Sequence, residues 1–140
     1  MIFKNFSESA VLLAQKIKGE GIDQSSVITY IDRDDLDYCQ LIADNLSLDL
    51  LYLPDLINKK YTFTLPNLII ADSGQTKGQE YNEFTDLLRK TSPKTKIYLA
   101  IPVIPASEEE FLKQTCDSLI TLHVEPLFFS VSQFYTNATY

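Results

Sequence analysis

Acidic and polar side chains that could do chemistry gather in two short stretches of the sequence. The first, DRDDLD at 32–37, holds four aspartates and one arginine. The second, DSGQTKG at 72–78, holds one carboxylate, two hydroxyls, a lysine and two glycines. Carboxylates bind cations or move protons, whereas hydroxyls, a lysine and backbone N–H groups at a helix start bind phosphates. The two stretches therefore predict opposite ligand preferences.

Each stretch follows a short apolar run that reads as a buried strand. Val27–Ile31 precedes the first stretch and Leu68–Ala71 precedes the second, and both runs are apolar on both faces, as buried parallel strands are. Further strands are predicted at 48–53, 97–101 and 119–124, with a short edge strand at 61–64. Helical spacing of apolar residues predicts helices at 9–17, 38–45, 81–88 and 107–116, the first opening after Ser7 and the last capped by Ser107 with Glu110.

Strands that alternate with helices of about ten residues imply right-handed crossovers and a parallel sheet. We therefore expect an α/β fold, a doubly wound, mostly parallel five-stranded sheet with helices on both faces, in a single domain that spans 1–140. Ligands bind such sheets at the carboxyl ends of the strands, where both chemical stretches are predicted to lie.

Composition narrows the classes of function. A net charge of −7 over 140 residues repels the nucleic-acid backbone, so no nucleic acid is expected as a partner. Apolar runs fall far short of the ~20 residues of a membrane span, and the first residues lack a secretory pattern, so a cytoplasmic protein without membrane contact is expected. Cys39 and Cys116 lack the spacing of zinc ligands, and we expect two reduced thiols and no metal site.

Four segments resemble the type I phosphoribosyltransferases, the stand-alone bacterial domains above all. Asn67–Gly78 is similar to the loop that binds phosphoribosyl pyrophosphate, and Val27–Leu46 to the family's first strand, pyrophosphate loop and helix. Phe3–Ile17 looks like the opening segment, and Glu125–Tyr135 resembles the closing segment. The resemblance covers most of the chain and implies a phosphoribosyltransferase-like fold.

The resemblance also implies roles for individual residues. Asp72 corresponds to the first of two acids that hold the ribose hydroxyls, and is the candidate catalytic residue. The candidate phosphate-binding residues are Arg33, Ser73, Gly74, Thr76, Lys77 and Gly78. By resemblance an active enzyme would bind a phosphorylated ribose compound, use Mg²⁺ and form a homodimer.

Four departures from the family pattern bear on activity. Ser73 stands where the family has its second acid, and Thr76 stands where some members have an aspartate general base. The first loop is acidic rather than rich in glycine, and only 54–67 is available as a lid. We expect a domain that is weakly active or inactive and serves as a binding or regulatory module. The alternative is an active phosphoribosyltransferase, or a related hydrolase, that binds its ligand through Asp72, Lys77 and Arg33.

Other interpretations of these residues stay open. Asp72 could cap the turn that follows it, with about equal weight to a ligand site. The acidic loop is interpreted as a solvated cap, although Asp32 and Asp34 also resemble the nucleophile loop of haloacid-dehalogenase-like phosphatases. His123 lacks a nucleophilic partner in the sequence. The aromatic run Phe128–Tyr135 favours a core or dimer contact over stacking on a base.

Overall fold

A five-stranded parallel sheet forms the centre of the protein. The computed structural model describes residues 1–58, 65–74 and 76–140. The strands are β1 (Val27–Tyr30), β2 (Asp49–Tyr52), β3 (Asn67–Ala71), β4 (Lys96–Pro105) and β5 (Ser118–Glu125), in the order β2-β1-β3-β4-β5. Every pair is parallel, so the predicted α/β fold is confirmed and its mostly parallel sheet is wholly parallel.

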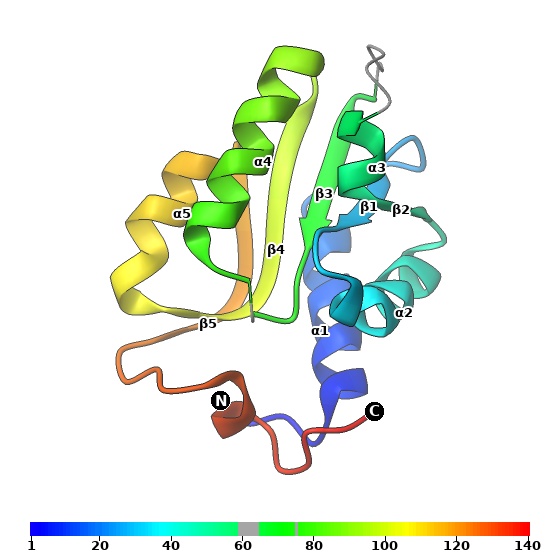
Figure 1. Ribbon diagram of the computed structural model, residues 1–140. Coiled ribbons are helices and arrows are strands. Elements are labelled where there is room, and N and C mark those ends of the chain that lie inside the picture. Colours follow the sequence, from blue (N-terminus) through cyan, green and yellow to red (C-terminus); the bar gives the residue numbers. More distant parts are fainter. Residues whose placement is uncertain (59–64, 75) are drawn as a thin grey trace.

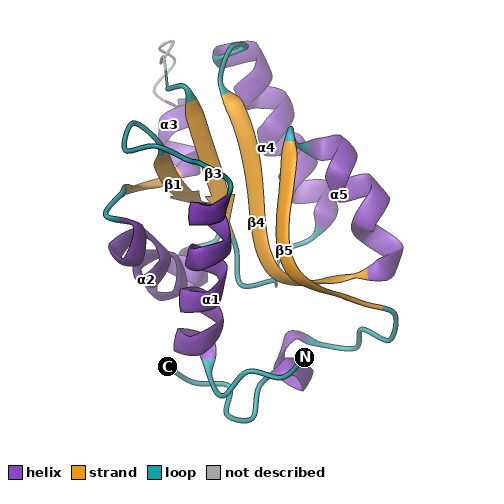
Figure 2. Cartoon of the chain, turned by 180° about the vertical axis from the view of Figure 1, so that it is seen from behind, coloured by secondary structure: helices purple, strands orange, loops and turns teal. Residues whose placement is uncertain are grey.

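Helices cover both faces of this sheet (Figures 1 and 2). They are α1 (Phe6–Gly19), α2 (Leu36–Leu46), α3 (Leu53–Asn58), α4 (Gly78–Thr91) and α5 (Glu109–Thr115). Side chains alternate along each strand, so Ile69 and Ala71 pack with α1 and α2, whereas Leu68 and Ile70 pack with α3, α4 and α5. The two apolar strands that precede the chemical stretches, β1 and β3, are thus buried on both faces.

Helix boundaries show where local signals succeed and fail. The predicted first helix is confirmed, but its cap is Asn5, whose side chain accepts the Glu8 N–H at 2.9 Å. The predicted capping box at Ser107 is wrong. Ser107 lies inside a 3-10 turn, η2 (Ala106–Glu108), and α5 starts at Glu109 without a side-chain cap.

Two elements differ from the sequence-based boundaries. Strand β4 continues to Pro105, through a region predicted to be a loop. Beyond Ala100 it pairs only with β5, so its other side is free. Pro102, which has no N–H group, is tolerated there because a free strand edge needs no donor. The strand predicted to run to Leu53 ends at Tyr52, and Pro54 lies in the first turn of the short helix α3, a position that proline favours. The edge strand predicted at 61–64 lies outside the described residues.

The two terminal segments lie together beyond the carboxyl ends of the strands (Figure 2). Phe3 donates its N–H to the Phe134 carbonyl at 2.7 Å and accepts the Thr136 N–H at 2.8 Å. The chain then runs to the start of α1, where the Phe6 N–H reaches the Thr139 carbonyl at 2.8 Å. Among the described helices, none has the length and apolar character needed to cross a membrane.

Candidate functional site

The two predicted chemical stretches meet at the point where the chain changes direction across the sheet. From β1 the chain moves outward to β2, and it then returns to place β3 on the other side of β1. Because Thr29 of β1 pairs with Ile70 of β3, the two strands end side by side. In doubly wound sheets this switch point is the usual place for a ligand.

A 3-10 turn, η1 (Arg33–Asp35), sorts the acidic stretch into exposed and buried carboxylates. The Asp32 side chain accepts the Asp34 N–H at 2.9 Å, which caps the turn as expected. Asp32 and Asp34 remain exposed, whereas Asp35 is only 4% exposed. The guanidinium of Arg33 lies 4.3 Å from the centre of the Tyr52 ring on β2. Arg33, a predicted phosphate-binding residue, is thus held by a cation–π contact with the neighbouring strand.

Asp72 lies directly beyond β3 and its own loop surrounds it. The side chain has no exposed surface. One carboxylate oxygen accepts the Gly74 N–H at 2.7 Å and the Thr76 N–H at 3.4 Å, and the other accepts the Thr76 hydroxyl. Gly74 has φ +109°, a conformation that residues with a side chain rarely adopt, and this lets the loop turn back. Two N–H groups predicted to hold a phosphate therefore hold this carboxylate.

Asp35 and Asp72 form a buried pair that joins the two loops. The Ser73 hydroxyl donates to Asp35 at 2.6 Å, and the Ser73 N–H lies 3.4 Å from the other Asp35 oxygen. Burial, followed by the charge of Asp72 and a hydrogen bond with it, raises the pKa of Asp35 to about 8. Asp35 is therefore protonated at neutral pH, and it can donate its proton to Asp72.

Two further groups border the pair from the helices. The Cys39 thiol of α2 donates to the Ala71 carbonyl at 3.2 Å, and burial raises its pKa, so it is a neutral thiol. Tyr81 of α4 is 1% exposed, and burial and then Asp72 raise the pKa of its hydroxyl. That hydroxyl lies near Asp72 and Thr76 but forms no hydrogen bond of good geometry with any described residue.

The remaining predicted site residues lie at the start of α4. Lys77 is the exposed N-cap residue of this helix. Gly78 is buried under α5, because a Cβ at this position would lie 3.1 Å from the Phe111 ring and 3.5 Å from a carboxylate oxygen of Glu108. The glycine thus permits close packing of two helices, and it brings a further carboxylate to the predicted phosphate loop.

The burial of Asp35 was not predicted, although the sequence contains a signal for it. Asp35, Tyr38, Cys39 and Ile42 follow the i, i+3, i+4, i+7 spacing of one helix face, and all four are buried. Tyr38 and Ile42 were used to predict the helix, whereas the aspartate at its start was assigned to solvent. The partner across the fold, Asp72, comes from a separate strand that helical spacing cannot connect.

Residues outside this site behave as structural groups. His123 lies 2.6 Å from the Glu125 carboxylate, two positions along the same strand. Cys39 and Cys116 are buried free thiols, as expected. In the part of the chain that the structure describes, no three side chains of the metal-binding types cluster together.

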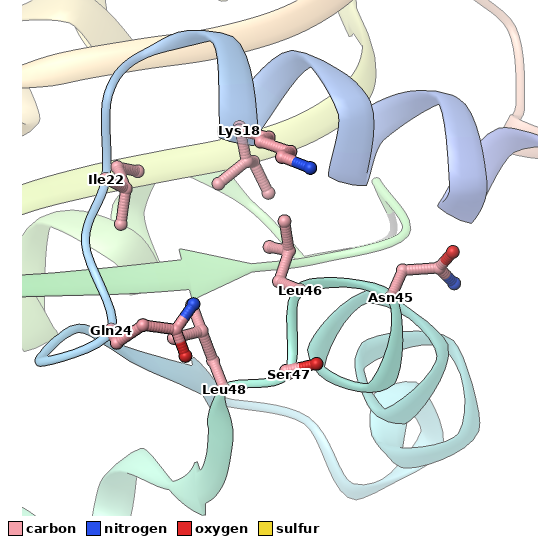
Figure 3. Close-up of a pocket in the computed structure, with 8 residues that line it drawn as sticks. Lys18, Ile22, Gln24, Asn45, Leu46, Ser47 and Leu48 are labelled. Atoms are coloured by element: carbon pink, nitrogen blue, oxygen red, sulfur yellow. The ribbon is translucent and has the colours of Figure 1, made fainter.

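A pocket lies at the amino ends of β1 and β2, near the C-terminal ends of α1 and α2 (Figure 3). It has a volume of about 230 Å³ and an apolar floor that includes Ile17 and Leu46. Lys18, Gln24 and Asn45 supply its polar side chains. The pocket residues Ile22, Gln24 and Leu48 precede β1 and β2, whereas Asp35 and Asp72 follow the carboxyl ends of β1 and β3, so the pocket is separate from the carboxylate site.

Comparisons with known proteins identify a similar fold but no family for this chain. No family model matches the sequence, and no curated protein matches it. The fold is similar to that in the crystal structure of TT1426 from Thermus thermophilus, with a TM-score of 0.79 and 13% sequence identity. The match covers 98% of this chain and 91% of the other, so the whole chain shares one known fold.

Proposed function

We propose that this chain is a phosphoribosyltransferase-like domain that has lost efficient transfer and serves as a binding or regulatory module. The main support is the position of Asp72, the candidate catalytic residue, which has no exposed surface. A carboxylate that holds ribose hydroxyls must offer free oxygens to the ligand. Both oxygens of Asp72 are bonded within its own loop, to Gly74 and Thr76.

The acidic first loop supports the same proposal. Asp32 and Asp34 are exposed beside the switch point, while Arg33 is drawn away onto Tyr52. Two like charges 4 Å apart cost about 4 kcal/mol at an effective dielectric constant of 20, and a micromolar ligand binds with only about 8 kcal/mol in total. Uncompensated carboxylates therefore disfavour a pyrophosphate at this position.

The two buried carboxyls of the site do not fit the Mg²⁺ of an active transferase. A magnesium ion needs ionised carboxylates with free oxygens. Asp35 is protonated at neutral pH and Asp72 has its oxygens occupied. The module is accordingly proposed to act without a metal. A cytoplasmic location and a homodimer complete the proposal, the dimer by the family resemblance.

The proposal is tested with phosphoribosyl pyrophosphate and Mg²⁺ at pH 7. A ligand present at 100 times its Kd stabilises the folded state by about 2.7 kcal/mol, which raises the melting temperature of a domain of this size by several degrees. We expect no shift in melting temperature, no binding heat and no release of pyrophosphate with purine or pyrimidine bases. Ribose 5-phosphate and pyrophosphate added separately serve as controls for each half of the ligand.

A shift of several degrees with micromolar affinity would overturn the proposal. Turnover that disappears in Asp72→Asn would instead establish the alternative, an active transferase or a related hydrolase. Since Asp72 also holds its loop together, the melting temperature of the variant must be measured in parallel. A variant that stays folded at the assay temperature separates lost chemistry from lost structure.

A further inference from the structure

The pocket at the amino ends of β1 and β2 has aliphatic walls from separate segments of the chain. Ile17 ends its lining on α1, Ile22 lies in the α1–β1 loop, and Leu46 and Leu48 lie at the end of α2 and just before β2. Ile17 belongs to the buried core, and the other three pack against that core while remaining partly exposed. A ligand that covers these three side chains removes apolar surface from water.

Hydrogen bonds of the backbone fix the two helix ends that form the pocket. At the end of α1 the Glu20 N–H donates to the Ile17 carbonyl at 3.0 Å. After α2 the Leu48 N–H donates to the Ala43 carbonyl at 3.0 Å, across Ser47, which has φ +54°. The pocket is therefore formed before any ligand arrives, which lowers the entropy cost of binding.

One amide group reaches into the space between the aliphatic walls. Figure 3 shows the Gln24 side chain extending toward Leu48, whereas the Asn45 side chain extends away from Gln24. The amide nitrogen of Asn45 already donates to the Leu41 carbonyl at 2.8 Å. The Gln24 amide forms no hydrogen bond with any residue that the structure describes, so both its carbonyl oxygen and its N–H groups are free for a ligand.

The electrostatics of the pocket favour an uncharged ligand. Both α1 and α2 end there, and a helix C-terminus is equivalent to about −0.5 of an elementary charge. Lys18 is the one charged residue in the lining, and its single positive charge offsets the two helix ends. The nearby carboxylates of Glu20, Asp23 and Asp44 are exposed to solvent and do not line the pocket. An ion of either sign would lose hydration here without gaining a partner of opposite net charge.

We propose that this pocket binds a small uncharged molecule in which an apolar ring or chain carries a carboxamide or cyclic amide. The apolar part lies against Ile22, Leu46 and Leu48. The amide pairs with Gln24, because an amide places a donor and an acceptor side by side and can form two reciprocal hydrogen bonds. The volume of about 230 Å³ holds about eight non-hydrogen atoms, at the ~30 Å³ that a water molecule occupies in the liquid. The site goes beyond the proposed function, since it shares no residue with the carboxylate site.

Three probes of nearly equal shape test the class of ligand: benzamide is neutral, benzoate is an anion and benzamidine is a cation. Each is titrated at pH 7 while the backbone amide signals of the protein are followed by NMR. We expect benzamide to bind with a Kd of about 1 mM, as its size allows, and to shift the amides of Lys18, Gln24 and Leu48. The amides of Asp35 and Ser73 should not shift. Both ions should bind at least about fivefold more weakly. Equal or tighter binding of either ion, or no saturable shift with benzamide, would overturn the proposal.

Gln24→Leu tests the amide pairing, because it keeps a side chain of similar size and removes the donor and the acceptor. We expect its affinity for benzamide to fall about tenfold, while benzene, which has no amide, binds at least as well as to the wild type. Gln114→Leu is the matched control, since Gln114 is an exposed glutamine of α5, on the opposite face of the sheet. Equal affinity of wild type and Gln24→Leu for benzamide would overturn the pairing.

Gln24→Glu decides if the leucine itself fills the pocket, which loss of benzene binding would reveal. This variant keeps the shape of the side chain and adds a negative charge, so benzamidine is expected to bind at least about fivefold more tightly than to the wild type. Unchanged affinity for benzamidine would show that residue 24 does not face the ligand and would overturn the proposal. Binding of phosphoribosyl pyrophosphate bears only on the proposed function, because that ligand is tested at the carboxylate site.

Discussion

One turn places chemically identical carboxylates in opposite environments. Asp32 and Asp34 face solvent, while Asp35 is 4% exposed and lies against Asp72. Burial penalises the charged form of Asp35, and a second carboxylate adds repulsion. Composition describes the turn as an acidic surface, whereas its buried member behaves at neutral pH as an uncharged hydrogen-bond donor.

The raised pKa of Asp35 predicts a pH dependence of stability. In the unfolded chain this carboxyl ionises near pH 4, about the ordinary value, whereas in the folded chain it keeps its proton to about pH 8. The folded state therefore binds the extra proton between these values, and stability falls as pH rises through this window. We expect a loss on the order of 1 kcal/mol per pH unit between pH 5 and 8.

Asp35→Asn is expected to remove this contribution, because the amide resembles the protonated acid. Urea denaturation at several pH values measures the free energy of unfolding of both proteins. The difference between them should grow as pH rises from 5 to 8, with the variant the more stable at pH 8. A constant difference would show that Asp35 does not hold a proton in the folded state.

Gly74 carries a second prediction at the residue scale. Its φ of +109° is disfavoured for residues with a side chain, and a Cβ would lie 3.4 Å from the Val103 carbonyl oxygen. We expect Gly74→Ala to lower the free energy of unfolding by about 1–3 kcal/mol. Gly21→Ala is the matched control, since Gly21 has φ +77° with no atom close to the added carbon, and a smaller loss is expected there. Equal losses would assign the whole effect to backbone conformation.

At the scale of elements, apolar patterns predicted what is buried better than capping signals predicted boundaries. Each of the five strands was found from its apolar run, and the signal is strongest for β1, β3 and β4, which are buried on both faces. The capping box predicted at Ser107 is wrong, because Ser107 lies within the 3-10 turn η2 and α5 begins only at Glu109. The extension of β4 past Pro102 depends on pairing with β5, which local sequence does not reveal.

One buried hydroxyl contacts α2 and the C-terminal segment from α1. Ser9 contacts the hydroxyl of Tyr38 at 3.0 Å and that of Tyr135 at 2.8 Å, and all three residues are buried. We expect Ser9→Ala to lower the free energy of unfolding by about 1–3 kcal/mol, because buried hydroxyls lose a partner. Thermal and urea denaturation measure this change.

Ser7→Ala is the control for this joint, because the Ser7 hydroxyl reaches only the Tyr140 carbonyl at an exposed position. A change within about 0.5 kcal/mol is expected there. A similar loss in both variants would show that the buried hydroxyl contacts contribute little to the joint.

At the scale of the whole molecule, the fold followed from the sequence more fully than the site did. Strand and helix periodicity led to a doubly wound sheet, and the strand order then placed both chemical stretches at one switch point. Periodicity does not show which way the side chain of Asp72 points. Whether Asp72 faces a ligand or its own loop depends on contacts with Gly74 and Thr76 that form only after the chain turns.

The proposed homodimer makes a prediction about the segment between β5 and the 3-10 turn η3 (Val131–Phe134). Phe134 and Tyr135 are buried, which agrees with the first of the two expected contacts, core or dimer, whereas Phe129 is 84% exposed and Leu127 67% exposed. Water-exposed aromatic and aliphatic side chains this close together favour association. We expect light scattering to give twice the 15.9 kDa mass of one chain.

Phe129→Ser is expected to shift that mass toward a single chain while each chain stays folded, because within one chain the side chain is 84% exposed and has few contacts to lose. Leu87→Ser, on α4 and 43% exposed, is the matched control and should leave the dimer intact. A wild-type protein that stays a single chain at high concentration would contradict the dimer. Dissociation by both variants alike would contradict an interface specific to the β5–η3 segment, since the substitution on α4 would then have the same effect.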